Sequence, residues 1–292
     1  MAANEREFTR IVLCFALAVL VGCNKAPADH PRITSNVVLR DETFRSAALG
    51  REMRYRVLLP TFINLERKRG VLYLLHGNGS NFRDWSNFSD VARFAESNLI
   101  LVMPQGDNSY YINAVERPRD RYEDYIIRDL IPDVEAKFHI APDRQNRAIA
   151  GVSMGGYGAI KLALSHPDLF AFAGSLSGPL DVPRRAFSIK RIQQSMAFRS
   201  IFGPPGSEAR RLDDPFTLAR PADAANAPYL FLSCGDQESL LPVNREFAAL
   251  LERQHLQYEF HVAQGGHNWN QWNKELPILF KRLRSSAFIS GQ

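Results

Sequence analysis

The chain has 292 residues, of which 45% are hydrophobic and 23% are charged. This is an ordinary globular composition, long enough for one large domain with a full core. The net charge is +5, but the lysines and arginines are scattered among acids and form no long basic run. A mildly basic surface is therefore the better interpretation, and we expect no nucleic-acid partner.

The N-terminus is typical of an export signal. Residues 11–22, IVLCFALAVLVG, form an apolar run that is too short to span a membrane in the mature protein. The run leads into LVGC at 20–23, which resembles the lipobox of bacterial lipoproteins. We expect residues 1–22 to be a signal peptide and Cys23 to carry a lipid. The alternative is an ordinary cleaved signal in which the cysteine occurs by chance.

The segment after Cys23 is polar and contains prolines, so residues 23–34 read as a tether between a membrane and a single domain at 35–292. Asn24 mildly favours the outer membrane, and we expect a lipoprotein of the cell envelope on the periplasmic side. Of the three cysteines, only Cys234 lies in the domain, so neither an intramolecular disulfide nor a thiol-based zinc cluster is possible there.

Apolar strands and amphipathic helices alternate along the domain, which predicts a parallel sheet covered by helices on both faces. Two opening strands with no helix between them predict an antiparallel edge. Residues 180–226 are rich in proline and glycine, and we expect them to form an insertion over one end of the sheet. The expected strands are 37–44, 53–60, 71–75, 99–103, 147–150, 172–176, 229–233 and 258–262. The expected helices are 90–97, 125–138, one ending near 164, one across 243–251, and 272–283.

A nucleophile motif follows the strand at 147–150. Residues 151–155, GVSMG, match the G-x-S-x-G elbow and have the required strand before and helix after. The two glycines leave room for a sharp, strained turn that raises the Ser153 hydroxyl above the sheet. There it meets a helix N-terminus, whose N–H groups favour a developing oxyanion. We therefore expect Ser153 to be the nucleophile.

Two backbone N–H groups are expected to form the oxyanion hole. One belongs to Met154, directly after the nucleophile. The other is expected from the loop in LLHGNGS at 74–80, where we assign it to Asn78 and keep Gly79 as the alternative.

The general base is expected to be a late histidine, because this fold orders its triad as serine, acid and histidine. Of the seven histidines, only His267 lies after the elbow in a loop that follows the last strand and precedes the last helix. We therefore expect His267 to be the base.

At this point the sequence resembles the esterase D/putative esterase family of α/β-hydrolases, a group that includes S-formylglutathione hydrolases, tributyrin esterases, feruloyl esterases and mycolyltransferases. The resemblance runs from about residue 40 to 285. It rests on motifs in the same order, among them LLHGNGSNFRDW, VMPQGDNSYY, AGVSMGGYGAIKLALSHPDLF, SCGDQESLLPVNREF and GGHNWNQW. It implies an α/β-hydrolase fold, with a cap-like insertion, that needs no metal or organic cofactor.

The resemblance also implies the triad acid. It reads SCGDQES at 233–239 as the family's C-G-x-x-D turn, in which the acid stands three residues after the glycine. That position is Glu238, a glutamate where the family has aspartate. Asp236 remains the alternative, because it lies closer to the strand end, although it is also suited to capping the turn.

The implied reaction is hydrolysis of a small ester through an acyl-enzyme. We expect short acyl or aryl esters, with two alternatives: an acyltransferase that uses a sugar or lipid hydroxyl, or a binding lipoprotein without activity. The loop VMPQGDNSYY places Tyr110 and Tyr111 either at the acyl pocket or in packing beneath a loop. From the insertion, we expect Phe187 and Phe202 to cap the pocket.

Overall fold

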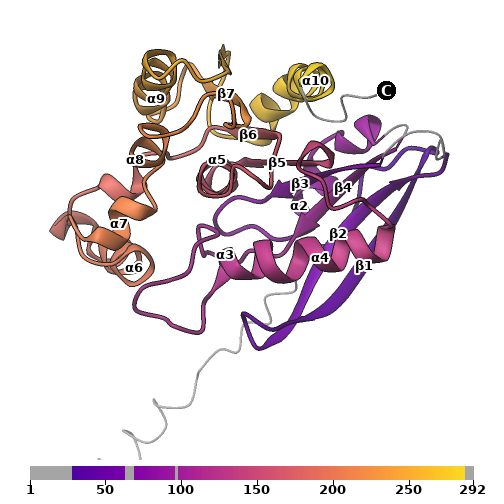
Figure 1. Ribbon diagram of the computed structural model, residues 1–292, viewed down its shortest axis with the longest axis horizontal. Helices are drawn as coiled ribbons and strands as arrows, with labels where there is room; N and C mark the ends of the chain where they lie inside the picture. Colours follow the sequence, from indigo (N-terminus) through magenta and orange to yellow (C-terminus); the bar gives the residue numbers. More distant parts are fainter. Residues whose placement is uncertain (1–27, 63–68, 96–97, 287–292) are drawn as a thin grey trace, which may run out of the picture. The chain divides into compact units, whose positions relative to one another are not determined.

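The computed structural model describes residues 28–62, 69–95 and 98–286 (Figure 1). Contacts divide the chain into two units, Met1–His30 and Pro31–Gln292, and the fold described below is that of the second. The expected signal peptide at 1–22 and the expected lipid site at Cys23 lie outside the described residues. Within the described ranges, no helix has the length and apolar character needed to cross a bilayer.

The second unit is built on a sheet whose strands lie in the order β1-β2-β4-β3-β5-β6-β7-β8. The first two strands pair antiparallel, β2 also pairs antiparallel with β4, and all later neighbours are parallel. This confirms the α/β-hydrolase architecture with an antiparallel N-terminal edge. The strands are β1 (Val37–Ser46), β2 (Arg51–Pro60), β3 (Gly70–Leu75), β4 (Leu99–Pro104), β5 (Arg147–Val152), β6 (Phe172–Leu176), β7 (Tyr229–Gly235) and β8 (Tyr258–Ala263).

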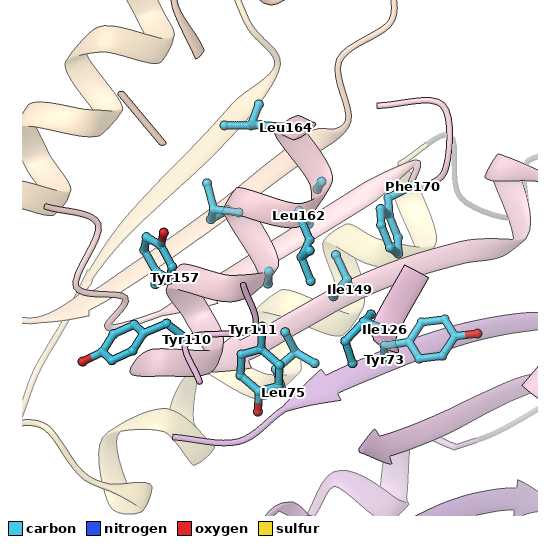
Figure 2. Packing of buried hydrophobic residues seen from close by; sticks show 14 of the residues in the cluster. Tyr73, Leu75, Tyr110, Tyr111, Ile126, Ile149, Tyr157, Leu162, Leu164 and Phe170 are labelled. Carbon is cyan, nitrogen blue, oxygen red and sulfur yellow. The ribbon is translucent and has the colours of Figure 1, made fainter. Parts of the chain in front are cut away.

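Helices cover both faces of the sheet. Alternate strand residues separate into two cores: Tyr73 and Ile149 belong to one, and Leu72 and Ala148 to the other. The first core includes residues of α3, α4, α5 and α9, and the second those of α2 and α10. Figure 2 shows Leu162 of α5 beside Ile149 in the first core. The helices are α2 (Asp84–Phe88), α3 (Tyr122–Asp124), α4 (Ile131–Phe138), α5 (Met154–Ser165), α6 (Ile192–Phe202), α7 (Glu208–Leu212), α8 (Pro215–Ala219), α9 (Leu241–Arg253) and α10 (Trp269–Ser285).

The structure differs from the expectation in one local segment. The helix expected at 90–97 is a single 3₁₀ turn, Val91–Phe94, with residues 96–97 outside the described part. The short helix α2, which the sequence analysis did not predict, precedes it. It is held by fully buried Trp85, whose indole N–H donates to the carbonyl of Leu75 at 3.0 Å. Five residues are too few for a helical period to be read from sequence, so a tertiary contact decides this segment.

The insertion at 180–226 folds into α6, α7 and α8. In Figure 1, α8 lies just below α9, and α7 and α6 follow below it at the left. The buried aromatic residues of the insertion, Phe198, Phe202 and Phe216, join the first core. The hydroxyl of Tyr157 on α5 donates to the carbonyl of Asp213 between α7 and α8 at 2.6 Å. The insertion is therefore fixed to the helix that follows the elbow.

Candidate active site

The strained turn expected at the elbow is present. Ser153 has φ 53° and ψ −120°, between β5 and the first residue of α5. Its side chain does not cap the helix. Instead, Oγ lies 2.8 Å from Nε2 of His267, in the loop between β8 and α10. The turn therefore directs the hydroxyl toward the imidazole rather than toward its own helix.

The glycines of the elbow are required by close backbone contacts. A Cβ atom built on Gly151 would lie 2.3 Å from the carbonyl carbon of Gly155. One built on Gly155 would lie 2.2 Å from the carbonyl oxygen of Leu75 on β3. Neither obstacle is a flexible side chain, so no other residue fits without moving the backbone. The steric reason for the motif is therefore visible at both positions.

Glu238 lies on the other side of the imidazole. Its Oε2 is 2.6 Å from Nδ1 of His267, and its side chain is 1% exposed, against 40% for the histidine. Its Oε1 accepts hydrogen bonds from the Ser177 hydroxyl at 2.6 Å and from the Gly235 N–H at 2.8 Å. Both carboxylate oxygens are therefore hydrogen-bonded, Oε2 to His267 and Oε1 to Ser177 and Gly235.

These contacts set the charge of Glu238. Burial raises the pKa of its carboxyl, but the hydrogen bonds from His267, Ser177 and Gly235 together outweigh burial and leave the pKa below its ordinary value. The group is thus an anion near neutral pH. An anionic acceptor fixes the proton of His267 on Nδ1 and leaves Nε2 free to accept one from Ser153.

Two residues of this network were missed by the sequence analysis. Ser177 follows β6 with φ 56°, and it receives a hydrogen bond from the indole N–H of Trp272 at 3.0 Å. The Trp272 ring also packs edge-on against His267, with 5.1 Å between ring centroids. Their partners are 61 and 95 residues away in the chain, so no local pattern signals them. The only hint is their position: Ser177 directly follows β6, and Trp272 lies in the first turn of α10.

Asp236 has a different task. It is exposed, and its Oδ1 accepts a hydrogen bond from the N–H of Gly265 at 2.9 Å. Its own N–H donates to the carbonyl of Ala263 at 2.8 Å. Asp236 therefore ties the end of β7 to the loop that carries His267, while Glu238 contacts the imidazole itself.

The loop after β3 lies against Ser153. A Cβ atom on Gly77 would be 3.5 Å from Cβ of Ser153. The N–H of Gly79 donates to Oδ1 of Asn108 at 2.7 Å, so it is already engaged. Among the described residues, the N–H groups of Asn78 and Met154 have no hydrogen-bond acceptor. Of the two alternatives in this loop, Asn78 is thus the one with a free donor.

A buried histidine supports this loop. His76 is 1% exposed, and its Nδ1 lies 2.8 Å from the carbonyl oxygen of Gly77 while Nε2 accepts from the N–H of Gly106 at 2.9 Å. Burial lowers the pKa of His76 to about 4, so the ring is neutral, with its proton on Nδ1. The Tyr111 hydroxyl also donates to the His76 carbonyl at 3.0 Å. Tyr111 is fully buried, so it packs beneath the loop.

A cleft of about 1080 Å³ opens beside Ser153 and His267. Tyr110 lines it and packs edge-on against Phe202, with ring centroids 5.3 Å apart. The expectation that Phe187 and Phe202 cap the pocket is wrong. Phe202 is fully buried behind Tyr110, Phe187 is 44% exposed, and neither lines the cleft. The insertion reaches the cleft through polar residues instead, because Phe198, Phe202 and Phe216 are used in the core. The polar residues are Asp181, Arg184, Arg185 and Arg191, beside Pro179.

The only cysteine among the described residues is buried in the core. Cys234 is a free thiol on β7, fully buried, and burial followed by the charge of Glu238 raises its pKa to about 12. It is therefore a protonated core residue. Among the described residues, no group of three or more metal-ligating side chains is found.

Known proteins resemble this chain over most of its length. Residues 46–283 match the family model described as "Putative esterase". An acetyl esterase of Caldicellulosiruptor saccharolyticus is 27% identical over 218 residues, which cover 72% of this chain and 82% of the relative. Esterase Rv1288 of Mycobacterium tuberculosis is 30% identical over 274 residues, covering 84% of this chain but 59% of that protein.

Solved structures agree with this resemblance. FphF, a fluorophosphonate-binding serine hydrolase of Staphylococcus aureus, has a TM-score of 0.72 at 27% identity, covering 85% of this chain and 98% of that one. Related proteins also include enzymes named diacylglycerol acyltransferase/mycolyltransferase.

Proposed function

We propose that this chain, which belongs to the putative esterase family and is therefore a carboxylic ester hydrolase, attacks its substrate through Ser153. His267 is the general base and Glu238 the acid of the triad. The observation that carries the proposal is the continuous line of contacts from Ser153 Oγ to His267 Nε2, 2.8 Å, and from His267 Nδ1 to Glu238 Oε2, 2.6 Å. Such a line is what activation of a serine hydroxyl requires.

The reaction has two halves. The proton of Ser153 passes to Nε2 of His267 as Oγ forms a bond to the ester carbonyl carbon. The carbonyl oxygen becomes an oxyanion that accepts from the N–H groups of Asn78 and Met154. Nε2–H then protonates the leaving alcohol as its bond to carbon breaks, which leaves an acyl-Ser153. Water repeats the sequence, releases the acid and restores the serine. Glu238 holds the imidazole orientation throughout and stabilises its cation.

We propose short acyl or aryl esters as substrates. Tyr110 stands in the cleft with Ser153, and its ring is fixed by Tyr157 and Phe202 behind it. Tyr110 therefore forms one fixed, aromatic part of the cleft lining. The resemblance to an acetyl esterase supports the same choice.

The test is hydrolysis of p-nitrophenyl esters of increasing acyl length. We expect the acetate or butyrate to be hydrolysed fastest, and Ser153→Ala to lose about a thousandfold or more in kcat. Ser165→Ala, at the other end of α5, is the matched control and should keep the wild-type rate. A wild-type protein with no activity on any ester of the series would overturn the proposal.

Acyl transfer is the second candidate. The cleft, about 1080 Å³, is at the upper end of the usual range for ligand sites, so it has room for an acceptor beside a short ester. Related enzymes are named acyltransferases. Adding sugar alcohols or glycerol to the assay distinguishes acyl transfer from hydrolysis. Transfer would yield acylated acceptor and raise the rate of alcohol release, whereas hydrolysis would release the alcohol with all of the acyl group as free acid.

The location proposed for the enzyme is the cell envelope. The support is the sequence alone, an apolar run at 11–22 followed by Cys23. Mass spectrometry of the mature protein should find an acylated N-terminal cysteine at position 23. A mature N-terminus at another residue, without lipid, would contradict this.

A further inference from the structure

The cleft beside Ser153 has a basic wall that the ester-hydrolysis mechanism does not use. Arg184, Arg185 and Arg191 all line it, and all three come from the insertion. Hydrolysis of a neutral ester requires the triad and the oxyanion donors, and none of these is an arginine. The charge on this wall therefore bears on which substrate is bound.

Two of the three cations are already neutralised. Arg185 binds Asp181 through two hydrogen bonds, Nε to Oδ2 at 3.0 Å and Nη2 to Oδ1 at 2.8 Å. Arg184 lies 3.1 Å from Oε1 of Glu246, and its guanidinium carbon stands 4.4 Å above the ring of Phe216. Each of these arginines is thus paired with a carboxylate that also lines the cleft.

Arg191 is the surplus cation. It lines the same cleft, yet among the described residues its guanidinium has no hydrogen-bond or ion-pair partner. The helix that follows it, α6, has no acidic residue in its first turn. The remaining carboxylate of the lining, Glu238, is buried and held by His267 and Ser177. One positive charge in the cleft therefore lacks a counter-ion within the protein.

We propose that Arg191 binds an anionic group of the substrate, so that the enzyme prefers esters that carry a carboxylate, sulfate or phosphate. This inference rests on the proposed function, because it names the substrate class of the same site. A guanidinium pairs with such oxyanions through two parallel hydrogen bonds, which fixes orientation as well as charge. The anionic group belongs either to the acyl part or to the alcohol part of the ester.

The experiment uses two matched pairs of esters, one for each source of the anion. The acyl pair is p-nitrophenyl butyrate and mono-p-nitrophenyl glutarate. The alcohol pair is phenyl acetate and 4-acetoxybenzoate. For each pair, kcat/KM is measured in the full-length protein, and the ratio of anionic to neutral ester is corrected for its spontaneous hydrolysis and leaving-group reactivity.

Arg191→Gln is the test variant, and Lys190→Gln is its control. Lys190 precedes Arg191 in the chain, is exposed and carries the same charge, but it does not line the cleft. We expect Arg191→Gln to lower the anionic-to-neutral ratio about fivefold or more in one pair, mainly through KM. Lys190→Gln should lower it less than about twofold. The pair that responds identifies the part of the ester that carries the anion.

Salt gives an independent reading. Raising the ionic strength from about 0.02 M to 0.5 M should reduce the wild-type preference and leave that of Arg191→Gln nearly unchanged. Equal ratios for wild type and Arg191→Gln in both pairs, with both neutral esters hydrolysed normally, would overturn the inference and leave the proposed function standing. Failure to hydrolyse even the neutral esters would instead count against the proposed function.

Discussion

Glu238 and Asp236 stand two residues apart but contact different groups. Glu238 Oε2 lies 2.6 Å from His267 Nδ1, whereas Asp236 Oδ1 accepts from the backbone N–H of Gly265 at 2.9 Å. One carboxylate therefore holds the imidazole of His267, and the other fixes the loop that carries it. The other oxygen of Glu238, Oε1, accepts a hydrogen bond from the Ser177 hydroxyl at 2.6 Å.

This division predicts unequal effects. Glu238→Gln should lower kcat by about a hundredfold or more with KM nearly unchanged, because the neutral amide no longer stabilises the imidazolium. Asp236→Asn keeps an oxygen for the Gly265 N–H and should cost less than about tenfold. Steady-state kinetics on one p-nitrophenyl ester measures both. The reverse ranking would assign the acid to Asp236.

The proposed oxyanion role of the loop at 76–79 can be tested with two glycines of similar geometry. Gly79 has φ +74° and Gly50, in the turn between β1 and β2, has φ +65°, and a Cβ atom on either would meet nothing within 4 Å. Alanine at either position should therefore cost about 1 kcal/mol of unfolding free energy, from backbone strain alone. Only Gly79→Ala should also lower kcat, since it moves the neighbouring N–H of Asn78. Denaturant unfolding and kinetics on both variants give the comparison. Equal kcat values in the two would remove this loop from the oxyanion site.

Two buried tyrosines offer a second matched comparison. The Tyr111 hydroxyl donates to the carbonyl of His76, whereas that of Tyr125 is buried without a hydrogen-bond partner in the described part of the chain. Tyr111→Phe should therefore destabilise the protein by about 1 kcal/mol and lower kcat several-fold, because the loop before Asn78 loses its support. Tyr125→Phe should be neutral or slightly stabilising. Thermal unfolding and kcat are the measurements, and a harmless Tyr111→Phe would show that His76 alone holds the loop.

The acid stability of the fold is expected to depend on Glu123. Burial raises the pKa of this carboxyl, but the hydrogen bond from His166 and the charge of Lys161 outweigh burial and lower the pKa to about 2 from an ordinary 4.5. A carboxyl with a depressed folded-state pKa stabilises the fold above its unfolded pKa and loses that contribution as pH falls. The window is therefore about pH 4.5 down to 2.

The comparison of wild type with Glu123→Gln isolates this contribution. At pH 7 the variant should be less stable, because Lys161 keeps only its pair with Asp213, at 3.2 Å. The difference should shrink by on the order of 2 kcal/mol between pH 5 and pH 2.5. Urea unfolding across that range measures it. A difference that is constant with pH would refute the role of the ionised carboxylate.

The parts of this molecule that were predictable from sequence depend on local physics. The apolar strands reveal the sheet, and the elbow is legible because the clashes at Gly151 and Gly155 arise from backbone atoms that any such turn brings together. The position of His267 follows from chain order. In each case, the signal lies within a few neighbouring residues or in the fixed order of the elements along the chain.

The rest depends on contacts between distant segments. Ser177 and Trp272 meet Glu238 and His267 only after β6, β7, β8 and α10 are assembled. From the sequence, it was also undecided whether the two tyrosines of VMPQGDNSYY line the acyl pocket or pack beneath a loop. In the fold, Tyr110 lines the cleft, whereas Tyr111 is fully buried and packs on Gly158. A Cβ atom on Gly158 would lie 2.6 Å from the Tyr111 ring. Phe202 was misplaced for the same reason, since burial of its ring in the core could not be read from a proline-rich insertion.

The most direct measurement of the central claim is intact-protein and peptide mass spectrometry after brief reaction with a fluorophosphonate or with p-nitrophenyl acetate quenched in acid. We expect one added phosphonyl or acetyl group per chain, located on the peptide that contains Ser153 and absent from Ser153→Ala. The Glu238→Gln variant should label more slowly at the same residue. An adduct on any other residue, or equal labelling of Ser153→Ala, would contradict the assignment of Ser153 as the nucleophile.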